Sequence, residues 1–157
     1  MKDESKVISF VVFFALTVAA ASMGALFQPG AWYAGLVKPA LTPPDWVFPA
    51  AWTILYLMIA VAGWMLWRDR DQHPLGRRAV ILWGSQLVLN AAWSWLFFGL
   101  HLTGLALVEI VLLWLVILLL VINGYRVRPL ASWLLVPYLV WVGFAAWLNL
   151  GIWRLNT

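Results

Sequence analysis

Five long apolar runs constrain the fold of this chain more than any other feature of its sequence. Each is nearly free of charge and close to the roughly 20 residues that a helix needs to cross a bilayer. They cover residues 7–27, 46–67, 79–100, 104–122 and 133–153. Charged residues make up 10% of the chain, against roughly 25% in soluble domains. We therefore expect an all-α polytopic membrane protein, a five-helix transmembrane bundle forming a single domain over residues 1–157.

The basic residues predict how the bundle sits in the membrane. Five alternating spans put eight of them on one side, namely Lys2, Lys6, Arg68, Arg70, Arg77, Arg78, Arg126 and Arg128, and leave Lys38 and Arg154 on the other. An excess of Lys and Arg marks cytoplasmic loops. We predict a multi-pass protein of the bacterial cell membrane, with the N-terminus and basic loops in the cytoplasm and the C-terminus and loop 28–45 outside. Since these residues lie in loops, no nucleic-acid partner is expected.

Several kinds of chemistry are excluded or unsupported. The chain has no Cys, which excludes disulfides, thiol catalysis and Cys-ligated metals. It shows no metal-ligand set, Ser/His/Asp set or phosphate-binding glycine loop, so we expect no conventional enzyme. His73 is expected to be solvated, and nothing near His101 marks it as a haem ligand. Glu109, the only acid inside a span, is expected to be solvated or paired within the helices, and the alternative is a role with a ligand or with protons.

The thirteen tryptophans predict a pocket. Interfacial belts explain Trp near the ends of spans, but not those several residues inside them. Aromatic and polar residues share helix faces: Trp46, Pro49, Thr53 and Tyr56 with Trp52 nearby; Gln86, Asn90, Trp93 and Phe97; and Tyr138, Trp141, Ala145 and Leu148 beside Asn149. Since neighbouring spans are antiparallel, Trp52, Trp93 and Ala145 lie about 9, 10 and 12 Å below the same surface. We expect an aromatic pocket there, with loop 28–45 as its lid. Asn90 either bonds a neighbouring helix or lines the cavity, or does both.

The same residues carry a family pattern. Trp32-Tyr33, Lys38-Pro39 and Pro43-Pro44-x-Trp46-Val47-Phe48-Pro49-x-x-Trp52-Thr53 closely resemble the first loop and second helix of the tryptophan-rich sensory protein/translocator protein (TspO/MBR) family. Gln86-Leu87-x-Leu89-Asn90-x-x-Trp93-Ser94 resembles its third helix, and Val136-Pro137-Tyr138-Leu139-x-Trp141 its fifth. The resemblance covers about residues 8–156.

The resemblance implies a five-helix bundle, often a homodimer, that requires no cofactor. It also implies binding of protoporphyrin IX, haem, sterols or related lipids, and isoquinoline-carboxamide or benzodiazepine drugs. Matched motifs give ligand-binding residues Tyr33, Trp52, Asn90, Trp93, Trp141, Ala145 and Leu148, to which Tyr138 is added from the same face of the fifth span. Trp52 and Trp141 match tryptophans implicated in light- and oxygen-dependent porphyrin breakdown by bacterial relatives.

Two details qualify what the resemblance implies. The four residues before Arg154, Leu150-Gly151-Ile152-Trp153, include no Tyr, so the sterol motif of mammalian members is incomplete. Small residues in the first span, Ala20 with Gly24 and Ala21 with Ala25, are candidates for a dimer contact.

Three functions remain open from the sequence. A binding and sensory protein for tetrapyrroles, acting in their transport or regulation, requires only a pocket. A photo-oxidative degrader of porphyrins would depend on the chemistry of the pigment, because no general acid or base is evident. A channel or transporter would need a polar path across the cytoplasmic half, which the sequence lacks. In addition, five spans cannot form the two matching halves of an inverted repeat.

Overall fold

The computed structural model describes residues 2–157, with side chains from residue 6 onward. Its elements are α1 (Lys2–Ala25), α2 (Ala31–Ala34), α3 (Val47–Arg68), α4 (Gly76–Ser94), the π-helical turn η1 (Trp95–Gly99), α5 (Thr103–Val127) and α6 (Pro129–Leu155). The described residues form no strand. Five helices are long and apolar enough to cross a membrane. The predicted all-α, five-helix membrane fold is therefore confirmed.

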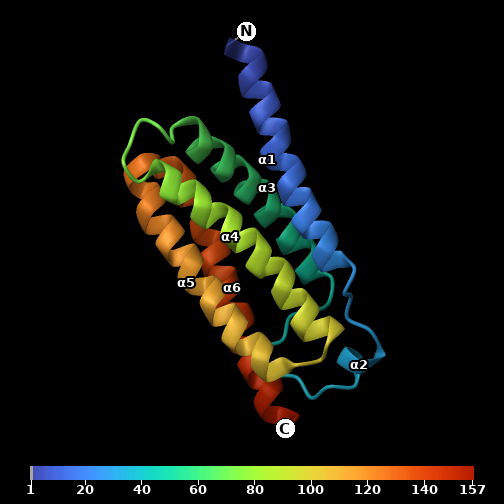
Figure 1. Ribbon diagram of the computed structural model, residues 1–157. Helices are drawn as coiled ribbons and strands as arrows, with labels where there is room; N and C mark the ends of the chain where they lie inside the picture. The colour runs from blue at the N-terminus through green and yellow to red at the C-terminus, as the bar shows by residue number, and fades with distance from the viewer. Residues whose placement is uncertain (1) are drawn as a thin grey trace.

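The helices form an antiparallel bundle with two distinct ends (Figure 1). The N-terminus, the α3–α4 loop and the α5–α6 turn lie at one end, which we call the basic end. Loop 28–45 with α2, the α4–α5 link and the C-terminus lie at the other, which we call the lid end. α1 packs on α3 and α4, whereas α5 packs between α4 and α6. The loops therefore alternate between the ends as the charge pattern predicts.

Close packing holds α3 against α4. A Cβ atom on Gly63 would collide with the ring of Trp83, so glycine lets the indole lie directly on the α3 backbone. There the Trp83 Nε1–H donates a hydrogen bond to the carbonyl of Ile59 at 2.9 Å. Because lipid tails are as apolar as leucine, membrane helices associate through such close contacts and hydrogen bonds rather than through the hydrophobic effect.

The α5–α6 turn is shorter than the predicted link. The apolar runs end at residue 122 and resume at residue 133, but α5 continues to Val127 and α6 starts at Pro129. Arg128 alone joins them in an extended conformation. Pro129 is compatible with an immediate start because the first helical residue has no N–H partner to lose. Apolar runs end where polar residues begin, whereas the helices continue through these residues.

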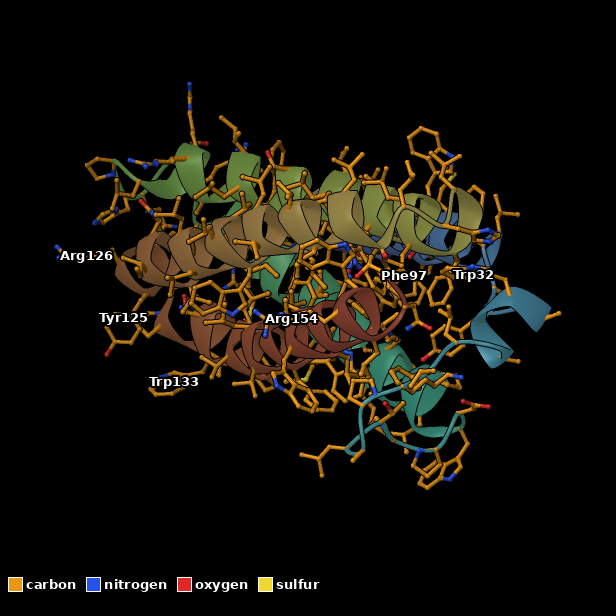
Figure 2. All side chains as sticks on the ribbon, turned by 90° about the horizontal axis from the view of Figure 1, so that it is seen from below. Trp32, Phe97, Tyr125, Arg126, Trp133 and Arg154 are labelled. Carbon is orange, nitrogen blue, oxygen red and sulfur yellow. The ribbon has the colours of Figure 1, made fainter. Side chains whose placement is uncertain are left out.

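Aromatic and basic side chains mark the ends of the bundle. Figure 2 shows Tyr125, Arg126 and Trp133 at one end, with Trp32 and Phe97 at the other. Tyr125 and Trp133 are exposed on the surface. Tyr and Trp concentrate at both interfaces of a membrane. The side chains therefore agree with a bundle whose ends lie at the two membrane surfaces.

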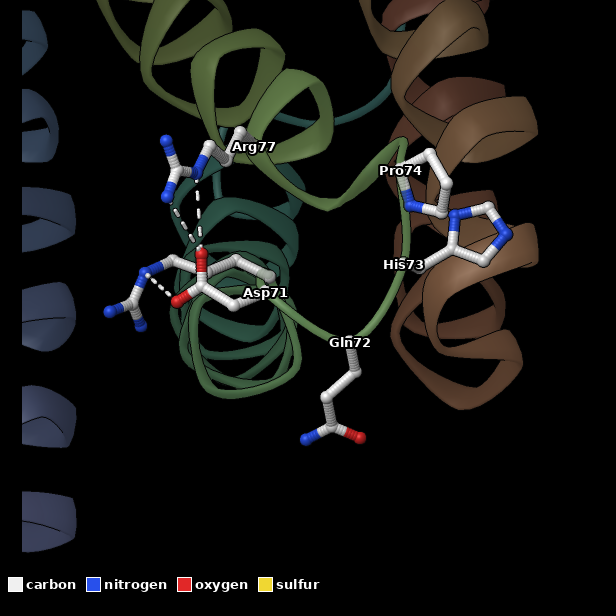
Figure 3. A pocket seen from close by; sticks show the side chains of 6 residues that line it. Asp71, Gln72, His73, Pro74 and Arg77 are labelled. Atoms are coloured by element: carbon white, nitrogen blue, oxygen red, sulfur yellow. Dashed lines mark hydrogen bonds and ion pairs between the residues drawn. The ribbon is translucent and has the colours of Figure 1, made fainter.

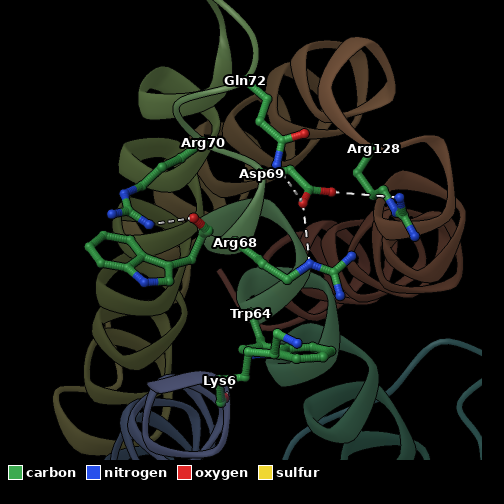
Figure 4. Close-up of polar contacts among 8 residues, drawn as sticks. Lys6, Trp64, Arg68, Asp69, Arg70, Gln72 and Arg128 are labelled. Carbon is green, nitrogen blue, oxygen red and sulfur yellow. Dashed lines mark hydrogen bonds and ion pairs between the residues drawn. The ribbon is translucent and has the colours of Figure 1, made fainter. Parts of the chain in front are cut away.

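Asp69 ties the end of α3 to the α5–α6 turn (Figure 4). This buried carboxylate accepts a hydrogen bond from Arg68 Nε at 3.2 Å, and its second oxygen lies 3.7 Å from Arg128 Nη1. Gln72 Nε2 also donates to it, at 3.5 Å. Asp71 in the same loop instead forms solvent-exposed ion pairs with Arg70 and Arg77.

We expect Asp69→Asn to destabilise the protein more than Asp71→Asn does. Removing the buried charge leaves two arginines without their shared partner, at a cost of about 1–3 kcal/mol. Exposed pairs contribute about 0–1 kcal/mol. Thermal unfolding in uncharged detergent, followed by circular dichroism, measures both variants. Equal decreases in Tm would contradict this assignment of the interhelical tie to Asp69.

Candidate functional site: an aromatic cavity beneath loop 28–45

A cavity of about 460 Å³ lies at the lid end between α1, α3, α4, η1 and α6. Its lining includes seven of the eight residues predicted as ligand contacts, namely Tyr33, Trp52, Asn90, Trp93, Trp141, Ala145 and Leu148. Small-molecule pockets of about 300–1,000 Å³ enclose most of a drug-sized ligand. The structure thus brings these residues together around one site of suitable size.

Stacked aromatic rings form the walls. Trp52 stacks on Tyr56 from the next turn of α3, with ring centroids 5.2 Å apart. Phe48 meets Trp141 of α6 edge to face at 6.0 Å, and Trp93 stacks on Phe97 at 5.1 Å. Such offset and edge-to-face arrangements are the favoured geometries of aromatic pairs. The walls therefore support one another rather than standing as isolated side chains.

A buried chain of hydrogen bonds joins three helices at the cavity. Tyr56 Oη donates to Asn90 Oδ1 at 2.8 Å, and Asn90 Nδ2 donates to Tyr138 Oη at 3.1 Å. Tyr138 Oη in turn donates to Gln86 Oε1 at 2.9 Å. Both alternatives for Asn90 hold, since it bonds neighbouring helices and lines the cavity. Buried polar groups in a membrane need such partners.

Tyr138 is the one predicted contact that the cavity does not include. Its side chain is fully buried, and its ring lies 6.1 Å from that of Trp52, between centroids. Tyr138 therefore lies behind the wall and positions Asn90 and Trp52. Tyr138 and Trp141 share a face of α6, but only Trp141 lines the cavity. The sequence could not predict this, because a shared helix face does not show how far the cavity extends along the helix.

A second polar contact anchors Trp93. Its Nε1–H donates to Asn149 Oδ1 at 3.1 Å, and Asn149 Nδ2 donates to the carbonyl of Thr103 at 2.8 Å. This connection joins α4, α6 and the start of α5. It fixes the plane of the Trp93 indole, while the small side chain of Ala145 leaves space beside the aromatic wall.

The π-helical turn η1 supplies a feature that the sequence analysis missed. Its wider turn is closed by the Leu100 N–H, which donates to the carbonyl of Trp95 at 2.9 Å. Both Phe97 and Phe98 line the cavity, and both contact the Tyr33 ring, with centroids 6.3 and 5.5 Å away. Single π turns often occur at functional sites. No signal in the residue pattern distinguishes this turn from ordinary helix.

Loop 28–45 covers the cavity and is fastened at its outer edge. Asn156 at the end of α6 makes a reciprocal pair with the Val37 backbone, accepting from its N–H and donating to its carbonyl, both at 2.9 Å. Trp32 stacks on His101 at 4.0 Å between centroids. His101 has a φ of 58°, which is uncommon for a residue other than glycine. His101 is not part of the lining and serves to hold the loop.

The small residues of α1, which the sequence marks as candidates for a dimer contact, make contacts within this chain. Ala21, Gly24 and Ala25 line the cavity, whereas Ala20 is buried in the core. A Cβ atom on Gly24 would lie 3.3 Å from Ser94 Oγ. The small residues of α1 therefore have contacts within one chain, and the predicted dimer contact there stays a prediction.

Two titratable side chains differ from their predicted surroundings. Both carboxylate oxygens of Glu109 are buried and lack a hydrogen-bond partner among the described residues, so neither predicted state, solvated or paired, is observed. His73 is half-buried, and its Nδ1 accepts a hydrogen bond from the Leu75 N–H at 3.1 Å. Helix position alone predicts distance from the membrane surface but not how neighbouring side chains cover an oxygen atom.

A second hollow, of about 530 Å³, lies at the basic end (Figure 3). Residues 70–74 and Arg77 line it. Asp71 accepts from Arg77 at 3.2 Å and pairs with Arg70 at 3.4 Å. Its charged side chains thus interact with one another, and it lacks aromatic walls. Across the described part of the chain, no group of three His, Cys, Asp or Glu residues could hold a metal ion.

Comparison with known proteins gives a consistent result. The TspO/MBR family model matches residues 11–154. Protein CrtK of Rhodobacter capsulatus is 36% identical over 147 residues, covering 94% of this chain and 92% of its own. Tryptophan-rich protein TspO of Chlorobaculum tepidum is 40% identical, covering 96% and 98%. Translocator protein of Sus scrofa is 42% identical over 131 residues, covering 80% and 75%.

We expect Tyr138→Phe to destabilise the bundle without removing a wall of the cavity. The variant leaves Gln86 Oε1 without its donor and Asn90 Nδ2 without its acceptor. In membrane proteins such bonds contribute about 0.6–2 kcal/mol each. Urea or thermal unfolding in detergent measures the loss, and Tyr125→Phe is the matched control because Tyr125 is exposed at the basic end. Equal stability of the two variants would contradict the role assigned to Tyr138.

Asn156→Ala is expected to loosen the loop selectively. The change removes both bonds to Val37, each contributing about 0.5–1.5 kcal/mol. Hydrogen–deuterium exchange should therefore become roughly tenfold or more faster in residues 31–41 and remain unchanged in α5. Thr157→Ala is the control, since that hydroxyl bonds only the carbonyl of Trp153. Unchanged exchange at Val37 in Asn156→Ala would show that other contacts fasten the loop.

Proposed function

Because this chain belongs to the TspO/MBR family, we propose that it is a membrane binding and sensory protein for tetrapyrroles such as protoporphyrin IX and haem. The ligand lies in the aromatic cavity beneath loop 28–45, and similar hydrophobic ligands, including sterols and benzodiazepine-type drugs, compete for the same space. The observation that carries this proposal is the cavity itself, with its stacked aromatic walls and few polar groups. Binding there serves the transport or regulation of the pigment.

The chemistry of the walls suits a flat aromatic ligand. The indole N–H groups of Trp83 and Trp93 are engaged within the protein. Those of Trp52 and Trp141, both in the cavity wall, make no hydrogen bond to any described residue. They are therefore available to an acceptor on a ligand. An aromatic ligand with a few acceptor atoms can stack on the rings of this wall and accept hydrogen bonds from its two available indole N–H groups.

Iron is not required for this proposal. The cavity lining, all of it within the described residues, contains no His, Cys or Met, which are common protein ligands of haem iron. Recognition would rest on the macrocycle and its substituents. Metal-free protoporphyrin IX is therefore the appropriate first ligand.

We propose further that the basic end faces the cytoplasm of a bacterial cell and the lid end faces outward. The support is the gathering of Lys and Arg in the loops of one end, as in cytoplasmic loops generally. A ligand would then approach the cavity from the outer side of the membrane. The homodimer implied by the family resemblance remains a prediction.

Protoporphyrin IX should quench the tryptophan fluorescence of the purified protein saturably in uncharged detergent. We expect Trp52→Phe and Asn90→Ala to raise the Kd about threefold to thirtyfold, since each loses roughly 1–2 kcal/mol of contact. Trp133→Phe makes the same chemical change as Trp52→Phe but lies at the basic end (Figure 2), and should leave the Kd unchanged. Quenching that fails to saturate, or identical Kd values in all four proteins, would show partitioning into detergent rather than binding in the cavity.

The availability of Trp52 and Trp141 favours light-dependent porphyrin breakdown as a second function. Two oxidisable indoles in the wall of one cavity would lie beside a bound photosensitiser. The pigment and oxygen would supply the reactivity, and the protein would hold the pigment against the indoles.

Illumination in air distinguishes breakdown from binding alone. If breakdown occurs, Trp141→Phe should raise the Kd for protoporphyrin IX by about threefold to thirtyfold, as Trp52→Phe does, and should still slow the loss of absorbance bands when the pigment saturates the protein. Trp133→Phe should change neither quantity. Equal bleaching with wild-type and Trp141→Phe proteins would leave binding as the function.

A further inference from the structure

We infer that Asp45 selects ligands by charge at the entrance of the cavity, favouring flat hydrophobic ligands with an ammonium or neutral polar end over those with a carboxylate. The inference rests on the proposed function only in taking the cavity as the ligand site. It adds a specificity-determining residue and a preferred chemical class of ligand.

The composition of the lining gives the first reason. Of the described residues that line the cavity, Asp45 alone carries a charge. It is exposed and lies between Pro44 and the start of α3. It makes no ion pair or hydrogen bond with any described residue. A carboxylate without an internal partner is not neutralised within the protein, so a ligand that enters beside it meets its field, weakened by water and salt.

The surroundings of Tyr33 give a second reason. Tyr33 is half-buried and lines the cavity from loop 28–45. Burial and the negative charge of Asp45 both raise the pKa of its hydroxyl. Asp45 and Tyr33, which both line the cavity, are thus close enough to interact electrostatically. A ligand carboxylate held near Tyr33 would experience the same repulsion.

Lys38 is the cation on the same loop, but its contacts hold its ammonium group outside the cavity lining. Its ammonium lies 4.6 Å from the centroid of the Tyr33 ring and donates to the carbonyls of Ala34 and Leu36, both at 3.4 Å. It is not part of the cavity lining and lies beyond ion-pair distance of Asp45. Its charge is therefore shared with loop carbonyls, while that of Asp45 faces the entrance.

Three pyrene probes that share one methylene linker test the inference without depending on tetrapyrroles. 1-Pyrenemethylamine is cationic, 1-pyreneacetate is anionic and 1-pyrenemethanol is neutral at pH 7. Energy transfer from tryptophan to pyrene reports binding in uncharged detergent. In the wild type we expect the amine to bind roughly threefold to thirtyfold more tightly than the acetate, from one charge pair in an aqueous entrance. This preference should weaken as salt rises.

Substitutions test whether Asp45 causes the tighter binding of the amine. Asp45→Asn should bring the Kd values of the amine and acetate together and leave that of the alcohol unchanged, whereas Asp45→Glu should keep the preference. Asp71→Asn makes the same change in net charge at the basic end and should have no effect. The inference is overturned by a preference for the acetate, by a preference that survives in Asp45→Asn, or by the absence of saturable binding of any probe.

Protoporphyrin IX and its dimethyl ester connect the result to the proposed function. The ester should bind more tightly than the diacid in the wild type, and Asp45→Asn should tighten binding of the diacid alone. If neither tetrapyrrole saturates but the pyrene preference depends on Asp45, the proposed function fails and the inference stands. If both tetrapyrroles bind and the charge preference is absent, the inference fails and the proposed function stands.

Discussion

The hydrogen bonds around Asn90 hold the shape of the cavity. Through Tyr56, Tyr138 and Gln86 they connect α3, α4 and α6 at the point where these helices would otherwise close together. Association of helices in lipid receives little help from the hydrophobic effect, so a few directional contacts set the separation of the helices. Each donor along this chain bonds the next acceptor as far as Gln86, whose buried Nε2 has no hydrogen-bond partner among the described residues. The aromatic walls therefore stand on a polar frame in which Tyr56 and Asn90 line the cavity, whereas Gln86 and Tyr138 are not part of its lining.

Much of this arrangement follows from the sequence. Uncharged length predicts the five spans, and helical spacing with alternating direction brings Trp52, Trp93 and Ala145 to one depth. Three features do not follow. The π turn depends on one shifted hydrogen bond, the position of Tyr138 depends on how deep the cavity extends, and the part played by Gly24 depends on α1 packing beside Ser94. Each is a matter of packing between helices, which the periodicity of a single helix cannot specify.

The tryptophans divide into roles according to what their N–H groups contact. Trp83 and Trp93 donate to acceptors within the protein and act as structural side chains. Trp133 and Trp153 are exposed on the outside of the bundle, where an indole suits the membrane interface. Trp52 and Trp141 form a third group, with rings held by neighbouring aromatics and N–H groups not engaged by described residues. Burial alone does not separate Trp93 from Trp52 and Trp141, which are all half-buried, because it does not record which N–H group has a partner.

A preformed cavity also has consequences for how a ligand enters and leaves. Empty space in a packed interior loses dispersion contacts, and large rings fixed by stacking and hydrogen bonds cannot easily move to fill it. A ligand of the right shape recovers those contacts without reorganising the walls, which favours affinity. Loop 28–45 is fastened by more local contacts, chiefly the Asn156–Val37 pair and the Trp32–His101 stack. Under the proposed function, loop opening would govern the rates of entry and release, while the walls and Asp45 would govern which ligands are retained.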